Sequence, residues 1–422
     1  MKIISVRNID KFAESVRPKP SKQNKKIVES ILFSVKKRGD YALKLYEKRF
    51  SGAKLNSLLV STKEIKQAYS KTSKEQLAAI KLAKKRLSKT ETAIKNQLNQ
   101  VIIKTDGIKI KKTFSPLSSV GCYVPGGLAR YPTTLVMSVV PAKIAGVNRV
   151  VVVSPPNKQG MIDPLTLVAA DICGIDEIYK TGGAQAIAAL SFGTKSIPKV
   201  DKIVGPGGSF VTTAKSLVSD ITSIDMIAGP TELCIIADET TNPNYVVYDL
   251  FSQAEHSNDT FCYVITTSPK FAMKLNQSIK DKISKAERKN IIQQSFSKNG
   301  FIALCKTKND VIKLVSKLAP EHLQIITKNP QQFASKIKTA GLVLIGKNTP
   351  SAASDYLLGS NHILPTNGFG KVRGSLSVLD FVKLGTEVES SKVGLRKIAK
   401  FMKALSEAEG LKNHYESVRS RL

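Results

Sequence analysis

The chain has no tryptophan, only four histidines in 422 residues, and five cysteines that lie far apart. The cysteines are odd in number and never form a Cys-x-x-Cys pair; they are Cys122, Cys173, Cys234, Cys262 and Cys305. This spacing argues against a disulfide framework and against a cysteine-based zinc site, and it favours reduced thiols in a cytoplasmic protein. No apolar run reaches the roughly 18 residues that a membrane-spanning helix needs, and the segment MKIISVRNIDKF lacks the pattern of a secretory signal.

Acidic residues are also few, and the formal net charge is +32. Such a charge is compatible with binding to nucleic acid or to an anionic membrane. However, the lysines are spread along the whole chain, and no cluster of arginine and aromatic residues is present that would stack on bases. We therefore expect a lysine-rich surface without a nucleic-acid or membrane partner, although an acidic substrate or a dinucleotide would be attracted to it.

The order of sequence patterns predicts an α/β fold. Helical patterns near 24–48 and 63–100 follow an N-terminal segment in which Pro18 and Pro20 indicate a linker or arm. From about residue 115, short β-branched runs such as RVVVVS alternate with helical stretches, which is typical of a parallel sheet. Gly182–Gly183 and Gly205–Gly208 each follow a strand and open a helix, where backbone N–H groups can hold an anion. Neither matches GxGxxG, so the dinucleotide signal is weak, and plain turn glycines are the favoured interpretation of both.

The four histidines each lie near a carboxylate or amide side chain. Gln253 and His256 are three residues apart, so a helix would place both on one face. The other three pairings are Glu321 with His322, Asp355 with His362, and Glu409 with His414. One such coincidence is weak, because a lone histidine is usually structural, but four together favour a single site. Imidazole with carboxylate and amide oxygens suits zinc or another divalent metal, and a Glu–His pair can provide a general base. From these residues alone we expect an α/β metalloenzyme that acts on a small polar substrate.

Seven motifs in order resemble one known family. The segments GCYVPGGLARYPTT, KTGGAQAIAAL, DMIAGPTELCIIAD, SQAEH, PEHL, DYLLGSNHILPT and EGLKNHYESV are similar to histidinol dehydrogenase from about residue 25 to the end. The resemblance implies oxidation of L-histidinol to L-histidine through histidinaldehyde, with two NAD⁺ and one zinc ion per subunit of a homodimer.

The resemblance also assigns the residues of the site. It implies zinc ligands at Gln253, His256, Asp355 and His414, with His414 and Glu409 completing the partner's site. His322 would be the general base of both hydride transfers, and Glu321 would activate the water that hydrates the aldehyde. The implied substrate contacts are Thr231, Gln253, His256, His322, Asp355, His362, Glu409 and His414, and the implied cofactor contacts are Tyr123, Gln185 and Gly208. Cys122 has no role in this scheme and is interpreted as structural.

The same resemblance implies two Rossmann-like domains, one inserted in the other, and terminal arms that form the dimer. We expect an arm at 1–22, a larger domain at 23–123 and 231–376, an inserted cofactor-side domain at 124–230, and a helical dimerisation tail at 377–422.

The sequence departs from the family pattern at a few positions. Gly208 replaces a usual asparagine and would remove one cofactor hydrogen bond, which weakens NAD⁺ affinity by roughly two- to tenfold. Ser257 replaces a usual aspartate, and the segment TPSAASDY is also atypical. Two other readings stay open: oxidation of a different amino alcohol, or a basic nucleic-acid binder that has lost catalysis.

Overall fold

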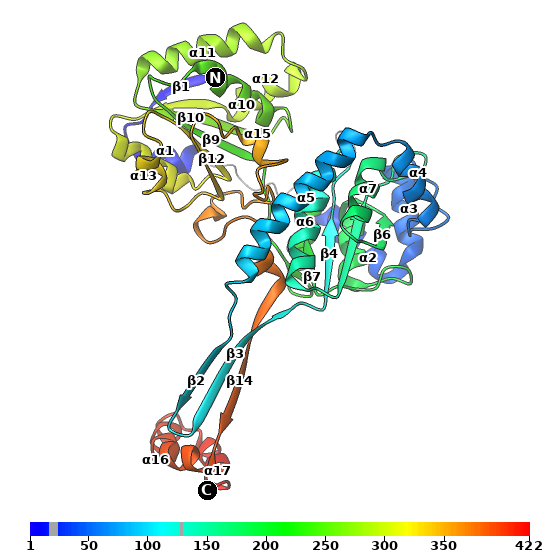
Figure 1. The fold of residues 1–422 in the computed structure, drawn as a ribbon, viewed down its shortest axis with the longest axis vertical. Coiled ribbons are helices and arrows are strands. Elements are labelled where there is room, and N and C mark those ends of the chain that lie inside the picture. The colour runs from blue at the N-terminus through cyan, green and yellow to red at the C-terminus, as the bar shows by residue number, and fades with distance from the viewer. Residues whose placement is uncertain (17–23, 127–129) are drawn as a thin grey trace.

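The structure of the chain, a computed structural model, describes residues 1–16, 24–126 and 130–422. It contains two domains built on parallel sheets and a long antiparallel stalk that ends in helices (Figure 1). Helices cover both faces of each parallel sheet. The predicted α/β fold with two Rossmann-like domains is therefore confirmed. The linker expected around Pro18 and Pro20 lies outside the described residues.

The first domain is built on a six-stranded sheet in which all strands run parallel. In order across the sheet, its strands are β1 (Lys2–Ser5), β11 (Phe301–Leu304), β10 (Phe261–Thr266), β9 (Glu232–Ala237), β12 (His322–Ile326) and β13 (Leu342–Ile345). Its helices are α1 (Ile9–Val16), α10 (Pro243–Ala254), α11 (Pro269–Ile283), α12 (Lys289–Asn299), α13 (Lys308–Leu318), α14 (Gln331–Ala334) and α15 (Ser351–Ser354). In β9, Cys234 and Ile236 pack under α1 and α13, whereas Leu233 and Ile235 pack under α10 and α11. Because both faces are covered, the central strands are apolar throughout.

The N-terminal residues belong to this sheet and do not form the separate arm that we expected. Strand β1 pairs in parallel register with β11, from Lys2 opposite Phe301 to Ser5 opposite Leu304. Helix α1 then packs on α13, with Phe12 edge-on to Phe301. The short segment KIIS carries too few residues for periodicity to distinguish an edge strand from an extended arm.

The second domain is built on a five-stranded parallel sheet. In order across the sheet, its strands are β6 (Glu177–Lys180), β5 (Arg149–Ser154), β4 (Ser119–Tyr123), β7 (Lys202–Val204) and β8 (Ser223–Ile224). Its helices are α2 (Lys25–Arg38), α3 (Asp40–Phe50), α4 (Thr62–Ser70), α5 (Lys74–Lys95), α6 (Pro132–Ala145), α7 (Pro164–Ile172), α8 (Gly183–Phe192) and α9 (Ser209–Leu217). This domain lies in the chain between α1 and β9, so one parallel-sheet domain is inserted in the other, as predicted.

The insertion starts about a hundred residues earlier than the expected boundary at 124. Helices α2 to α5 were expected in the larger domain, but α5 packs on α6 and α7, and α2 packs on α8 and α9. The physical reason lies in α6 and α8, which are buried at nearly every position. A helix that is apolar on all sides must be covered on all sides, and the N-terminal helices supply this outer layer.

The stalk consists of three antiparallel strands: β2 (Val101–Thr105), β3 (Ile108–Pro116) and β14 (Val382–Ser390). Asp106 and Gly107, both with positive φ, form the two-residue turn between β2 and β3. The 3₁₀ turns η1 (Phe369–Lys371) and η2 (Val378–Phe381) precede β14, and α16 (Lys392–Ala408) and α17 (Lys412–Arg419) form the tip far from both domains (Figure 1). We expected the segment 377–422 to be a helical tail, but nine of its residues form strand β14. No described helix is long and apolar enough to cross a membrane.

Candidate active site

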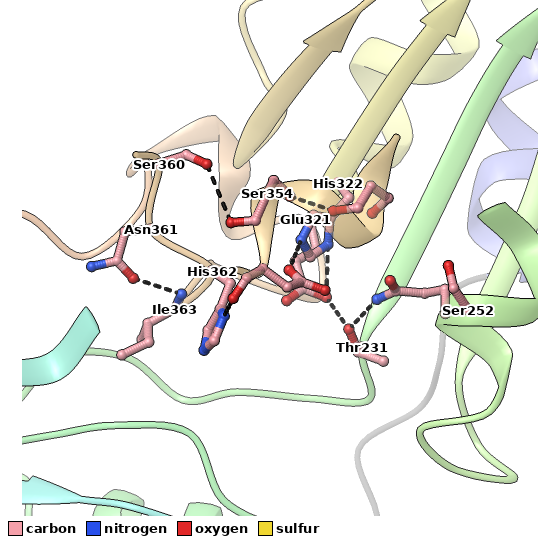
Figure 2. A network of polar contacts seen from close by, with 12 residues as sticks. Thr231, Ser252, Glu321, His322, Ser354, Ser360, Asn361, His362 and Ile363 are labelled. Carbon is pink, nitrogen blue, oxygen red and sulfur yellow. Dashed lines mark hydrogen bonds and ion pairs between the residues drawn. The ribbon is translucent and has the colours of Figure 1, made fainter. Parts of the chain in front are cut away.

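The predicted Glu321–His322 pair lies at the amino end of the six-stranded sheet. His322 is the first residue of β12, beside the start of β9, and both side chains of the pair are buried. Gln253 lies in the last turn of α10, and His256 follows just after the helix ends, where it is exposed. Asp355 follows α15. The sheet thus gathers strand starts and a helix end around one point (Figure 2).

Thr231 connects two of the predicted residues. Its hydroxyl donates to Glu321 Oε2 at 2.7 Å (Figure 2) and accepts from Gln253 Nε2, also at 2.7 Å. The backbone N–H of Glu232 donates to the same Glu321 oxygen at 2.6 Å. Glu321 Oε2 is therefore fixed by two donors.

His322 lies between two carboxylates. Its Nδ1 lies 3.8 Å from Glu321 Oε2 and its Nε2 lies 3.7 Å from Asp355 Oδ1. Burial of the ring lowers the pKa of His322, but the Glu321 charge and the Asp355 carboxylate outweigh it and raise this pKa to about 10. Burial raises the pKa of Asp355, but His322, together with the charges of His362 and His256, outweighs burial and lowers it. Three of the four histidines thus act on Asp355.

His362 connects the two domains. Its Nδ1 lies 3.0 Å from the backbone oxygen of Asp355, and its Nε2 lies 2.9 Å from Thr134 Oγ1 in the first turn of α6. A carbonyl oxygen only accepts, so Nδ1 carries the proton and Nε2 accepts from Thr134. Burial lowers the pKa of His362, in opposition to Asp355, which agrees with this neutral form. Both ring nitrogens are used within the chain, so a substrate contact by His362 would require the bond to Thr134 to open.

Glu232 was not identified from the sequence, although it contacts both residues of the Glu321–His322 pair. Its carbonyl oxygen lies 3.2 Å from His322 Nδ1, and its carboxylate accepts from the backbone N–H groups of Asn367 at 2.8 Å and Glu321 at 3.3 Å. Burial and the Glu321 charge raise the pKa of Glu232 to about 8, although hydrogen bonds oppose them. A charged residue at the start of the apolar strand ELCIIA was the available signal.

The predicted cofactor residues lie at the carboxyl end of the five-stranded sheet. Tyr123 ends β4, Gln185 lies in the first turn of α8, and Gly208 caps α9. Strand order reverses between β4 and β7, and such a switch point is where parallel α/β sheets bind ligands. Tyr123 and Gln185 are buried, whereas a side chain at Gly208 would enter open space.

The two glycine turns differ in how many of their N–H groups are bonded within the chain. Gly182 N–H donates to Glu47 Oε1 at 2.9 Å, and Gly183 N–H donates to the Tyr123 hydroxyl at 3.1 Å. Gly205 N–H donates to Asp225 Oδ2 at 2.8 Å. Gly205 has φ +112° and packs directly on the backbone of Tyr123, so its lack of a side chain is required.

Two predicted residues are not brought to this site within one chain. Glu409 follows α16 and His414 lies in α17, both at the tip of the stalk (Figure 1). Within the described parts of one chain, no three His, Cys, Asp or Glu side chains converge to hold a metal ion. The predicted zinc ligands include a glutamine and a residue of a second chain, so a cluster of His, Cys, Asp and Glu side chains within one chain would not contain all of them. The zinc site therefore stays a prediction.

Comparison with known proteins identifies the family. The sequence model described as histidinol dehydrogenase matches residues 15–422. The chain is 42% identical to a histidinol dehydrogenase of Clostridium acetobutylicum over 98% of this chain and 96% of that protein. It is 43% identical to one of Methanocaldococcus jannaschii, over 94% and 92% of the two chains. The crystal structure of histidinol dehydrogenase from Elizabethkingia anophelis superposes with a TM-score of 0.93 at 34% identity, over 100% of this chain and 98% of that one. The chain therefore belongs to the histidinol dehydrogenase family, and it is an oxidoreductase of that family.

Proposed function

We propose that the chain oxidises L-histidinol to L-histidine through histidinaldehyde, with two NAD⁺ and a zinc ion that holds the substrate. The observation that carries this proposal is the state of His322. Its Nε2 is buried and makes no hydrogen bond to a described residue, and it lies 3.7 Å from Asp355 Oδ1, whereas Nδ1 lies on the side of Glu321. A buried nitrogen without a partner is costly unless a ligand provides one.

The backbone of Glu232 supports the role of His322 as a base. Because the Glu232 carbonyl oxygen can only accept, it holds the proton of His322 on Nδ1. When the ring is neutral, the lone pair lies on Nε2, 3.7 Å from Asp355 Oδ1. Although burial lowers the pKa of His322, the two carboxylates raise it to about 10, so this neutral form requires a cation on Asp355. A general base needs such an open lone pair at the position of the substrate hydroxyl.

The two residues divide the chemistry between them. In the first oxidation, His322 takes the hydroxyl proton while hydride passes from carbon to NAD⁺, and the aldehyde forms. Glu321 then takes a proton from water as the water oxygen bonds to the aldehyde carbon, and the protonated His322 gives its proton to the carbonyl oxygen, which yields the hydrate and restores the base. In the second oxidation, His322 takes a hydrate proton while hydride passes to a second NAD⁺, and the carboxylic acid forms. Each hydride transfer yields one NADH.

The donor set fits zinc. The Thr231 hydroxyl gives its single proton to Glu321, so it must receive one from the Gln253 amide nitrogen. This bond leaves the Gln253 amide oxygen as the atom available for a metal, beside Asp355 and His256. A mixed oxygen and imidazole set suits a borderline ion such as zinc. Neutralising Asp355 with a cation also removes one of the carboxylates that raise the pKa of His322, which favours the neutral base.

The position of the tail supports a homodimer in which His414 and Glu409 complete the partner's site. The stalk carries both residues far from their own chain's Gln253 and Asp355 (Figure 1). Helix α16 exposes large apolar side chains that a second chain would cover, namely Val393, Phe401 and Leu405. The dinucleotide is proposed to bind near Tyr123, Gln185 and Gly208 at the switch point of the five-stranded sheet.

Two variants test the roles of the pair. Loss of a general base reduces rates by about 10²–10⁴-fold, so His322→Ala should lower turnover by that amount while zinc content is unchanged. Glu321→Gln keeps an acceptor for Thr231 but cannot take a proton, so it should slow conversion of histidinaldehyde more than oxidation of histidinol. Glu239→Gln, an exposed site near the other end of β9, is the matched control. Full activity of either variant of the pair would contradict the assignment.

A further inference from the structure

A buried carboxylate, Glu47 of α3, lies at the start of α8. Glu47 is fully buried, and its Oε1 accepts from Thr181 Oγ1 at 3.0 Å, Gly182 N at 2.9 Å and Gln185 Nε2 at 2.8 Å. Its Oε2 accepts from Ser51 Oγ at 2.8 Å. The helix N-terminus that could hold a cofactor phosphate is therefore already occupied by a carboxylate of the protein.

This contact decides which way the Gln185 amide points. Glu47 Oε1 already accepts from the Gly182 N–H and the Thr181 hydroxyl, so the amide presents its nitrogen to it as a third donor. The opposite orientation would place two oxygens against each other at hydrogen-bond distance. Gln185 Oε1 therefore points away from Glu47, and it is buried without a hydrogen-bond partner among the described residues.

The open oxygen lies beside the other predicted cofactor residue. A side chain at Gly183 would come within 2.8 Å of Gln185 Oε1, and the Gly183 N–H donates to the Tyr123 hydroxyl. The hydroxyl accepts this bond, so its own hydrogen is available to a further group. One acceptor and one donor thus flank Gly183, at the carboxyl end of the sheet.

We propose that Glu47 is a positioning residue that fixes Gln185 as a hydrogen-bond acceptor for the dinucleotide. Gln185 then recognises a donor group of the cofactor, a ribose hydroxyl or an amino group, and it rejects a phosphate oxygen at this point. This inference rests on the proposed use of NAD⁺. It assigns a function to Glu47, which touches no cofactor itself.

The test compares NAD⁺ dissociation constants of the full-length protein and its variants. Glu47→Ala should weaken NAD⁺ binding by about three- to tenfold, the effect of one lost hydrogen bond. Gln185→Leu should have a similar effect, and the double variant should be no weaker than either single one, because both changes remove the same contact. Glu47→Gln can keep its oxygen toward the three donors and place its nitrogen on the Ser51 hydroxyl, so it should restore affinity to within about twofold of the unmodified protein.

A matched control and a salt series separate this role from a structural one. Glu64 pairs with Lys180, the residue before Thr181, at 3.1 Å but does not touch Gln185. Glu64→Ala should therefore leave NAD⁺ affinity unchanged. The loss caused by Glu47→Ala should persist at high ionic strength, because the lost contact is a hydrogen bond and salt screens only the change in charge. Additive losses in the double variant, or unchanged NAD⁺ affinity in Glu47→Ala, would overturn the inference. If the unmodified protein does not bind NAD⁺, the proposed cofactor itself would be overturned.

Discussion

At the scale of single residues, one threonine hydroxyl orders the site. Thr231 donates to Glu321 and accepts from Gln253, so it fixes both the proposed water activator and the amide oxygen proposed for zinc. Sequence motifs predicted these residues but not their bonds. The hydrogen bond between Thr231 and Glu321 joins positions 90 residues apart, so the sequence around either residue does not predict it.

Replacing this hydroxyl should disturb both functions. Thr231→Val keeps the shape but removes a hydrogen bond to a charged group, which costs on the order of 1.5–3 kcal/mol, or roughly ten- to a hundredfold. We expect turnover to fall by that factor and zinc to be lost more readily to a chelator. Thr231→Ser keeps the hydroxyl and should remain within a few-fold of the unmodified enzyme. Equal activity of the Val and Ser variants, measured as kcat with zinc content, would show that the hydroxyl has no such role.

At the scale of elements, buried strands and helices were predictable and edge elements were not. Continuous apolar segments such as RVVVVS form interior strands. A strand that is covered on both faces is apolar at nearly every position, and this pattern is visible in a single sequence. Strand β1 and the stalk strands were missed, since short or exposed strands carry weak periodicity. The Asp106–Gly107 turn was a readable signal, because Asp-Gly favours a two-residue hairpin turn.

One contact between elements predicts a pH effect on stability. Glu91 of α5 is buried and accepts from Val378 N–H of η2 at 2.7 Å. Burial, together with Asp380, raises its pKa from 4.5 to about 7. A raised carboxyl pKa contributes stability that is present at pH values below 4.5 and is lost as pH rises through 7.

Glu91→Gln removes this titration. The variant should gain at most about 3 kcal/mol over the unmodified protein between pH 4.5 and 7. The difference should then stay constant at higher pH. Thermal unfolding monitored by circular dichroism across this range measures it. A difference between the two proteins that is the same at every pH would contradict the proposed titration.

At the scale of the whole molecule, the candidate site lies at the amino end of the six-stranded sheet and contacts the second domain. His362 links it to α6 of the second domain, and the stalk holds His414 and Glu409 apart from it. Sequence patterns predicted a parallel α/β sheet, and the resemblance to histidinol dehydrogenase implied two such domains with one inserted in the other. They did not predict that residues 25–95 cover the inserted sheet, because a helix pattern shows which face is apolar but not which domain that face meets.

The proposed sharing of the site between two chains predicts complementation between two inactive variants. His322→Ala and His414→Ala should each be inactive as homodimers. After they are mixed, dissociated and reassociated, each heterodimer should contain one intact site, since in the proposed dimer His322 comes from one chain and His414 from the other. Random pairing should therefore restore up to about a quarter of the unmodified activity. No recovery in verified heterodimers would place His414 in its own chain's site or outside catalysis.

The most direct measurement is the number of NADH molecules formed per L-histidinol consumed by the zinc-loaded protein. Two oxidations with one hydride each predict a ratio of two, with L-histidine as the product and no free aldehyde. The ratio should hold from the first turnovers onward, because one site performs both steps. A ratio of one with released histidinaldehyde, or no NADH at all, would contradict the account.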